Sequence, residues 1–243
     1  MLIPLSIAIF FVALAYASVG HGGASGYIAV LSLAAVEAAH LRPTALILNV
    51  VISAIGTLLF FWRGHFRHML LWRFLIFSLP MAWLGGRIVL PSTGYRILLG
   101  CVLLFSAARL AMSQETRCGE AQPVPLLLAA LAGAGIGFVS GLVGVGGGIL
   151  LTPLLVLTGW ANAKTAAAVS APFICLNSLA GLIGLGVNGI SHAMPTTAWL
   201  AVAALAGGIP GAIWGSGSAT PLAMRRVLAA VLVLAAGKLL FVH

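Results

Sequence analysis

The sequence predicts an all-α, polytopic membrane protein of about eight helical elements in two inverted repeats. Hydrophobic residues make up 62% of the 243 positions, only 6% are charged, and the mean hydropathy is +1.18. A soluble domain would carry about a quarter charged residues. Uncharged apolar runs long enough to cross a ~30 Å hydrocarbon core recur along the chain. In addition, the two halves resemble each other, and each opens with a glycine-rich interruption.

The first half, residues 1–112, is expected to form the first membrane repeat. Its N-terminus, "MLIPLSIAIFFVALAY", lacks the basic region of a signal peptide and is expected to stay as the first membrane segment. That element is interrupted by glycines in "YASVGHGGASGYIAV". The predicted elements are 4–36 with this break, 43–62, 70–90 and 94–112.

The stretch "SQETRCGEAQP", residues 113–123, is polar enough to be a connector and divides the chain nearly in half. The second repeat, residues 124–243, opens with an apolar run interrupted by "GLVGVGGGILLTP". Glycine in a helix interior costs roughly 1 kcal/mol relative to alanine, so five glycines within eight residues predict a break. The predicted elements are 124–158 with this break, 164–187, 194–216 and 222–242.

Matching motifs indicate that the halves arose by duplication. Gly20-His21-Gly22-Gly23 aligns with Gly144-Val145-Gly146-Gly147, 124 residues later. The segments "SLPMAWLGGR" and "YRILLGCVLLFSAAR" likewise resemble "GGIPGAIWGS" and "RRVLAAVLVLAAGK". The spacing drifts by a few residues, as expected when loops change after duplication.

The length of the broken elements bears on the orientation of the repeats. The 33 residues of 4–36 would form a helix about 50 Å long, too long for one untilted crossing. The break is therefore either a kink in a spanning helix or the tip of a re-entrant hairpin. A hairpin leaves three crossings per half and inverts the second half.

Basic residues favour the inverted arrangement, because cytoplasmic loops are enriched in lysine and arginine. Inverted repeats place eight basic residues inside: Arg63, Arg67, Arg73, Arg109, Arg117, Lys164, Arg225 and Arg226. Four then lie outside: Arg42, Arg87, Arg96 and Lys238. Parallel repeats would give six and six. Broken segments at matching positions of inverted halves are typical of a transporter binding site near the midplane.

Composition also argues against several functional classes. The net charge of +9 lies mostly in short connections, so anionic lipid headgroups explain it better than nucleic acid. Cys101, Cys118 and Cys175 have no CxxC spacing, which predicts neither a disulfide framework nor a metal site. No HExxH motif occurs, so we expect no enzyme activity and no cofactor.

The glycine breaks are the candidate binding site. Hydrocarbon cannot satisfy broken-helix backbone groups, so such backbone must be buried in protein or line a wet cavity. The helix after each break begins with free N–H groups and the positive end of its dipole, which together favour an anion. Alternatively, the glycines only allow close helix packing. That alternative suits the residues spaced by four (Gly133, Gly137 and Gly141; Gly207, Gly211 and Gly215) but not Gly146-Gly147-Gly148.

The predicted substrate-binding residues come from the breaks and from polar positions inside apolar segments. His21 can titrate near neutral pH and either strengthen anion binding or carry a coupled proton; alternatively it donates to an exposed carbonyl. The polar residues could instead bridge helices. The full set is Gly20, His21, Gly22, Gly23, Asn49, Ser53, Gly144, Gly146, Gly147, Gly148, Asn177 and Ser178.

Three stretches, "GFVSGLVGVGGGILLTPLL", "ASVGHGGASGYIAVLSL" and "KTAAAVSAPFICLNSLAG", resemble the sulfite exporter TauE/SafE family, also called the toluene-sulfonate uptake permease family. The resemblance covers nearly the whole chain. It implies two homologous halves and transport of a small sulfur-containing anion, such as sulfite, thiosulfate, sulfoacetate or another organosulfonate, across the bacterial inner membrane. His21 departs from the pattern, because the second motif has Val145 there.

Several alternatives stay open at this point. An anion channel of the same fold, or a carrier of a non-sulfur carboxylate or oxyanion, would fit the same features. The sequence names neither the anion, the direction of transport, the coupling ion nor the oligomeric state. The glycine face at Gly207, Gly211 and Gly215 could pack within the chain or between two chains of a homo-oligomer.

Overall fold

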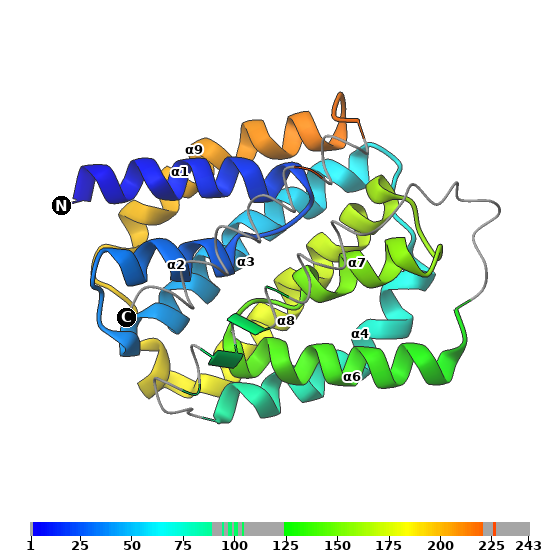
Figure 1. The fold of residues 1–243 in the computed structure, drawn as a ribbon, viewed down its shortest axis with the longest axis horizontal. Coiled ribbons are helices and arrows are strands. Elements are labelled where there is room, and N and C mark those ends of the chain that lie inside the picture. Colours follow the sequence, from blue (N-terminus) through cyan, green and yellow to red (C-terminus); the bar gives the residue numbers. More distant parts are fainter. Residues whose placement is uncertain are drawn as a thin grey trace.

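The computed structural model describes residues 2–88 and 124–220, with a few single positions between 94 and 104 and Arg226. All secondary-structure elements of this part of the chain are helices, which confirms the predicted fold class (Figure 1). Its helices are α1 Leu2–Ser18, α2 Ala24–Leu33, α3 Ala38–Trp62, α4 His68–Arg87, α6 Leu126–Val143, α7 Gly148–Leu157, α8 Ala163–Ile190 and α9 Thr197–Ser216. The predicted connector 113–123 lies outside the described residues, and so does most of the predicted elements 94–112 and 222–242.

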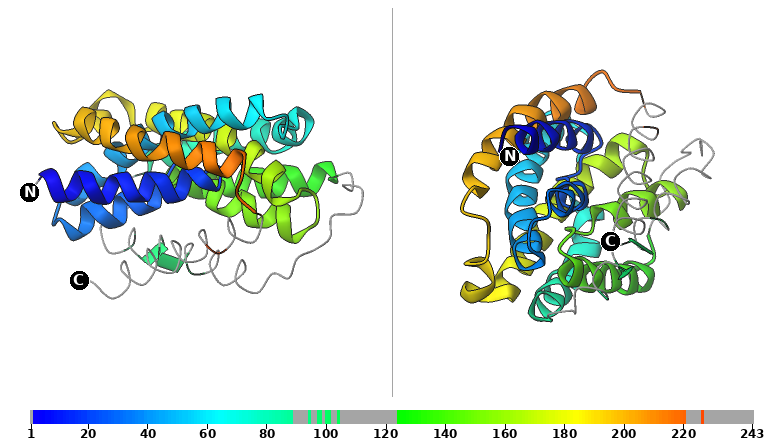
Figure 2. Two further views of the ribbon diagram at one scale, coloured as in Figure 1. Left: turned by 90° about the horizontal axis from the view of Figure 1, so that it is seen from above. Right: turned by 60° about the vertical axis from the view of Figure 1, so that its left-hand side comes forward.

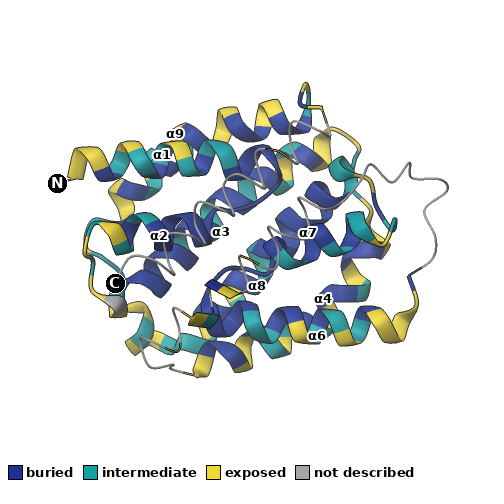
Figure 3. Cartoon of the chain, viewed as in Figure 1, coloured by how far each residue is buried: buried dark blue, intermediate teal, exposed yellow. Residues whose placement is uncertain are grey.

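Five of these helices are long and apolar enough to cross a membrane: α3, α4, α6, α8 and α9. The helices α1, α2 and α7 are shorter apolar segments. Large apolar side chains such as Phe11, Leu127 and Ile183 are exposed on the outer surface, where lipid tails would solvate them. Buried residues line the faces that the helices turn toward one another (Figure 3). The predicted polytopic membrane protein is therefore confirmed.

Each long broken element forms two helices, and the chain turns back between them. The segment predicted at 4–36 becomes α1 and α2, and α2 returns toward the end of the bundle at which α1 starts (Figures 1 and 2). The segment predicted at 124–158 becomes α6 and α7, and α7 likewise returns toward the end at which α6 starts (Figure 1). Of the two forms predicted for the breaks, this arrangement is the hairpin.

The first helix of each half packs along a helix of the other half. Three glycines of α9 lie against carbonyls of α1, in the pairs Gly207–Phe10, Gly211–Leu14 and Gly215–Ser18. Three glycines of α6 lie against α4, in the pairs Gly133–Phe74, Gly137–Ser78 and Gly141–Ala82. Residue numbers rise together in each pair, so both helix pairs are parallel. The α9 glycine face therefore packs within the chain.

The directions of the helices are compatible with inverted repeats. Helix α9 runs parallel to α3, because Thr197 near its start contacts Thr44 and Gly217 at its end lies near Arg63. The turn after Arg63 reverses the chain into α4. Since α1 is parallel to α9 and α6 is parallel to α4, the two first helices run in opposite directions.

Close backbone approach requires glycine at Gly137 but not at Gly135, and this difference can be tested. A Cβ at Gly137 would lie within 2.7 Å of Ser78, whereas a Cβ at Gly135 would meet nothing within 4 Å. We expect Gly137→Val to push α6 away from α4 and lower stability by about 1–3 kcal/mol or more. Gly135→Val carries the same change in helix propensity on the same helix. Thermal unfolding in detergent should show a clear loss for the first variant only; equal losses would contradict the packing.

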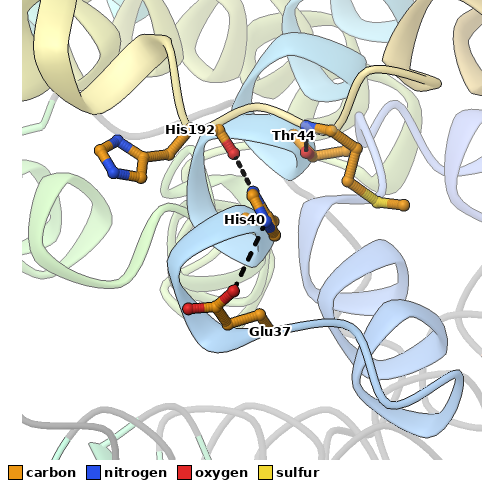
Figure 4. Close-up of polar contacts among 5 residues, drawn as sticks. Glu37, His40, Thr44 and His192 are labelled. Carbon is orange, nitrogen blue, oxygen red and sulfur yellow. Dashed lines mark hydrogen bonds and ion pairs between the residues drawn. The ribbon is translucent and has the colours of Figure 1, made fainter.

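One end of the bundle is closed by contacts between two corners of the chain. The His40 Nδ1–H group donates to the carbonyl of His192, and Glu37 Oε2 lies 3.7 Å from His40 Nε2 (Figure 4). One turn further along α3, Thr44 Oγ1 accepts a 3.0 Å hydrogen bond from the amide of Met194. The α2–α3 and α8–α9 connections therefore meet at this end.

The opposite end joins the start of α8 to the end of α9, because Lys164 Nζ donates to Gly217 O at 2.8 Å. Within residues 2–88 and 124–220, this end holds four basic residues: Arg63, Arg67, Arg73 and Lys164. The other end holds two, Arg42 and Arg87. The excess of basic residues lies at the end that the inverted arrangement places on the cytoplasmic side, which is the end with the α3–α4 turn.

Candidate functional site

The two glycine breaks share left-handed residues at two equivalent positions, and they differ at a third, where Gly146 is left-handed with a φ of 78° and Gly22 is not. Gly20 and Gly144 are left-handed, with φ of 74° and 83°, and so are Gly23 and Gly147, with φ of 97° and 78°. Two equivalent hydrogen bonds run back into the preceding helices. The amide of His21 donates to Tyr16 O at 2.9 Å, and that of Val145 donates to Ser140 O at 3.3 Å. The repeat read from the sequence thus extends to the local geometry of the breaks.

Each break ends at the N-terminus of a short helix. Gly23 is the N-cap of α2 and Gly147 is the N-cap of α7, and neither provides a side chain to cap the helix. The first intrahelical bonds are again equivalent, from Tyr27 N to Gly23 O at 2.9 Å and from Leu151 N to Gly147 O at 3.0 Å. Helix N-termini leave their first N–H groups without intrahelical partners and carry a partial positive charge. Both breaks therefore end at a helix terminus whose partial positive charge would favour an anion.

The side chain of Asn49 on α3 connects the two breaks. Its Oδ1 accepts a 3.2 Å hydrogen bond from the amide of Ala24, the first residue of α2. Its Nδ2 donates to Ser178 Oγ at 2.8 Å and to Val145 O, within the second break, at 3.4 Å. Asn49 is fully buried. The two breaks therefore lie one side chain apart.

Glycine is required at the positions that face Asn49. A Cβ at Gly22 would collide with Asn49 Oδ1, and a Cβ at Gly146 would collide with Asn49 Nδ2 and lie 2.8 Å from Ser178 Oγ. A Cβ at Gly148 would run into Ile174 on α8. Local packing thus explains these glycines in addition to any role in binding.

His21 extends from the first break to the first turn of α7. Its Nδ1–H donates to Val19 O at 2.9 Å, which leaves Nε2 as the acceptor in the neutral ring. Thr152 Oγ1 lies 3.3 Å from Nε2 and 2.7 Å from Ser170 Oγ on α8. These contacts fit both roles predicted from the sequence, since the ring donates to a backbone carbonyl of the break and also contacts a pair of hydroxyl groups.

Other predicted site residues lie at varying distances from the breaks. Gly20 packs its Cα against Ala167 of α8. Ser53 Oγ donates to Asn49 O at 2.6 Å, one turn along α3, and so supports the helix that holds Asn49. Asn177 lies elsewhere: its Oδ1 accepts from Ser78 Oγ on α4 at 2.7 Å, and its Nδ2 donates to Phe173 O at 2.9 Å. The structure thus groups Asn49 and Ser178 with the breaks and places Asn177 between α4 and α8.

Arg42 is a buried cation that sequence reasoning counted only as an outside charge. It is 9% exposed, near the start of α3. Its guanidinium donates to Gly85 O at 3.1 Å, Gly86 O at 3.0 Å and Ile88 O at 3.0 Å, and also to Gly141 O. These carbonyls belong to the C-terminal ends of α4 and α6, where the helix dipole favours a cation. Its Cγ lies 2.8 Å from the position of a Cβ on Gly144, so the aliphatic part of the side chain packs against the second break, while the guanidinium reaches Gly141 O, three residues before Gly144.

Three further polar residues were missed although the sequence contained signals for them. Thr152 lies four residues after Gly148, one helical turn into α7. Tyr27 lies four residues after Gly23 and ends the first turn of α2. Ser140 is 124 residues after Tyr16 and occupies the equivalent position before the break. Measuring distances along the chain from the break glycines would have selected all three.

Two comparisons with known proteins agree that the chain resembles membrane transporters. The model of the family described as "Sulfite exporter TauE/SafE" matches residues 5–239. The chain is also 38% identical over 245 residues to a protein of Sinorhizobium fredii (strain NBRC 101917 / NGR234) named "Probable membrane transporter protein y4hK", covering 98% of each chain. No solved structure gives a significant match.

Proposed function

This chain belongs to the sulfite exporter TauE/SafE family of membrane transporters, and on that premise we propose that it carries a small sulfur-containing anion bound between its two glycine breaks. The candidate substrates are sulfite, thiosulfate, sulfoacetate and other organosulfonates. The observation that supports this site most directly is that the glycine-capped N-termini of α2 and α7 lie one side chain apart, across Asn49.

Electrostatics favour an anion at this point. Two helix N-termini contribute roughly +0.5 elementary charge each. The buried Arg42 guanidinium, which donates to Gly141 O, adds a positive charge at the end of α6, three residues before Gly144. In residues 2–88 and 124–220 the acidic side chain is Glu37, which lies at the end of the bundle with His40 and not at the breaks. A small oxyanion would therefore meet attractive partial charges without a competing carboxylate.

The membrane potential bears on the direction of transport. Moving a dianion out of a cell that is 100 mV negative inside releases about 4.6 kcal/mol, twice the value for one charge. Export therefore needs no coupling ion, whereas uptake does. His21 is the residue through which a proton could be coupled, by way of Thr152 and Ser170. We propose facilitated export as the simpler mode and proton-coupled uptake through His21 as the second.

A current measurement on purified protein in liposomes tests the proposal. Rapid jumps of sulfite, thiosulfate, sulfoacetate and phosphate on a solid-supported membrane should give a saturating current with at least one sulfur oxyanion and a smaller one with phosphate. A non-saturating current would indicate an anion channel of the same fold. A response to phosphate alone would indicate a carrier of non-sulfur anions. Silence in both current and radiolabel counterflow would contradict anion transport altogether.

The same assay tests the role of His21. If a proton moves through this ring, His21→Gln should abolish the effect of an imposed pH gradient on the sulfur-oxyanion current, because glutamine does not titrate. The anion affinity should change much less, since the amide can keep the hydrogen bond to Val19 O. Thr158→Ala serves as a control, because Thr158 donates only to carbonyls of its own helix, Leu154 O and Leu155 O. An unchanged response to the gradient in His21→Gln would limit His21 to a structural role.

A further inference from the structure

Two buried hydroxyl groups, one at each break, have no hydrogen-bond partner within the described part of the chain. They are Tyr27 Oη and Ser140 Oγ. Tyr27 is 0% exposed and Ser140 is 2% exposed, so neither residue is open to the surface of the protein. Buried tyrosine and serine hydroxyls in folded proteins are nearly always hydrogen-bonded.

Other hydroxyl groups near the breaks do have hydrogen-bond partners. Tyr16, in the same break as Tyr27, pairs its Oη with Ser25 Oγ at 2.7 Å. Helical Ser18 and Ser53 donate to carbonyls three or four residues back, at 2.7 Å and 2.6 Å. Ser140 occupies a helix in the same way but makes no such bond. The two unpartnered groups therefore differ from comparable residues nearby.

Both hydroxyl-bearing residues face the glycine that begins the returning helix. The Tyr27 ring folds back along the first turn of α2, so that its Oη lies 2.9 Å from the position of a Cβ on Gly23. Ser140 Cβ lies 3.3 Å from the equivalent position on Gly147. Each helix N-terminus thus has an uncommitted donor beside its left-handed N-cap residue.

We propose that Tyr27 Oη and Ser140 Oγ are the side-chain ligands of the transported anion, one from each break. This inference rests on the proposed function and specifies its site. Each O–H group would donate to an anion oxygen, and hydrogen bonds to a charged acceptor are about twice as strong as neutral ones. The donors carry no charge, so they neither attract a second anion nor hold the substrate too tightly to release it.

The proposal predicts an unusual combination of effects for Tyr27→Phe and Ser140→Ala. Neither substitution removes a hydrogen bond from the substrate-free protein, so the melting temperature should stay the same or rise. The KM of the current for the best sulfur oxyanion should rise about tenfold or more in each variant, because a charge-assisted hydrogen bond is lost. Tyr16→Phe is the matched control: it breaks the bond to Ser25 and should lower the melting temperature with little change in KM.

Thermal protection by the anion gives a second readout that does not depend on transport. Sulfite, thiosulfate or sulfoacetate should raise the melting temperature of the wild type, and Tyr27→Phe and Ser140→Ala should need about tenfold more anion for the same shift. If the wild type transports and is protected but both variants match it, this inference is wrong and the proposed function stands. If the wild type shows neither current nor protection, both are wrong.

Discussion

Gly146→Ala is expected to abolish transport by a protein that still folds. Gly146 has a φ of 78°, and a Cβ there would collide with Asn49 Nδ2 and lie 2.8 Å from both Ser178 Oγ and Ile174 Cγ2. The added methyl group must displace the side chain of Asn49, which connects the two breaks. We expect at least a hundredfold loss of the saturable sulfur-oxyanion current, measured on protein that elutes as a single species and melts cooperatively.

Gly64→Ala is the control for backbone strain. Gly64 has a φ of 75°, nearly the same as Gly146, but lies in the α3–α4 turn with nothing within 4 Å of its Cβ position. Both alanines adopt a left-handed conformation, which costs roughly 1–2 kcal/mol. Gly64→Ala should therefore lose similar local stability and keep its current. Normal transport in Gly146→Ala would show that the contact with Asn49 is dispensable.

The second large effect is expected from Asn49→Asp. The aspartate can still accept from the amide of Ala24, but it no longer donates to Val145 O or Ser178 Oγ, and it places a negative charge between the two helix N-termini. The carboxylate would repel an anionic substrate that binds between the breaks. We expect KM to rise by a hundredfold or more at neutral pH. Acidification should partly restore affinity, because protonation removes the charge.

Asn177→Asp provides a matched comparison. Asn177 is as deeply buried as Asn49, and its Oδ1 also accepts a hydrogen bond while its Nδ2 donates to a backbone carbonyl, Phe173 O. Each aspartate loses the donor to a backbone carbonyl, which costs about 1–3 kcal/mol. Asn49→Asp also loses the donor to Ser178 Oγ, but that hydroxyl can donate to the new carboxylate instead. Both variants should therefore melt earlier by similar amounts, but the increase in KM should be much larger for Asn49→Asp. Equal increases in KM would mean that the anion does not bind between the breaks.

Much of the fold could be predicted because membrane helices follow simple physical rules. Apolar length alone located the elements, and the start predicted at 164 lies within one residue of α8, which begins at Ala163. The glycine motifs located both breaks: the three adjacent glycines Gly146-Gly147-Gly148 cannot share one helix face, and Gly20-His21-Gly22-Gly23 is the matching motif of the first half. Membership of the family also followed from motif residues and is confirmed over residues 5–239.

The candidate site was predicted less completely, because the contacts of its side chains depend on which helix faces pack against each other. Asn49 and Asn177 have similar local sequences, and only the packing of α3 against α8 and of α8 against α4 separates them. Arg42 lies in "LRPT", near a helix end, where an arginine usually reaches the headgroups. Its burial depends on carbonyls of two other helices, α4 and α6, which no local pattern reveals. Binding by these residues stays a prediction.

The first helix of each half packs against the other half, α1 against α9 and α6 against α4, and this has a consequence for biosynthesis. Helix α1 leaves the ribosome first, yet the helix against which it packs, α9, is made near the end of the chain. During translation α1 must therefore remain in the bilayer, or with an insertion factor, until most of the protein has been made. The two halves expressed separately should each be unstable, and co-expressing them should rescue both, since each supplies the surface that the other lacks.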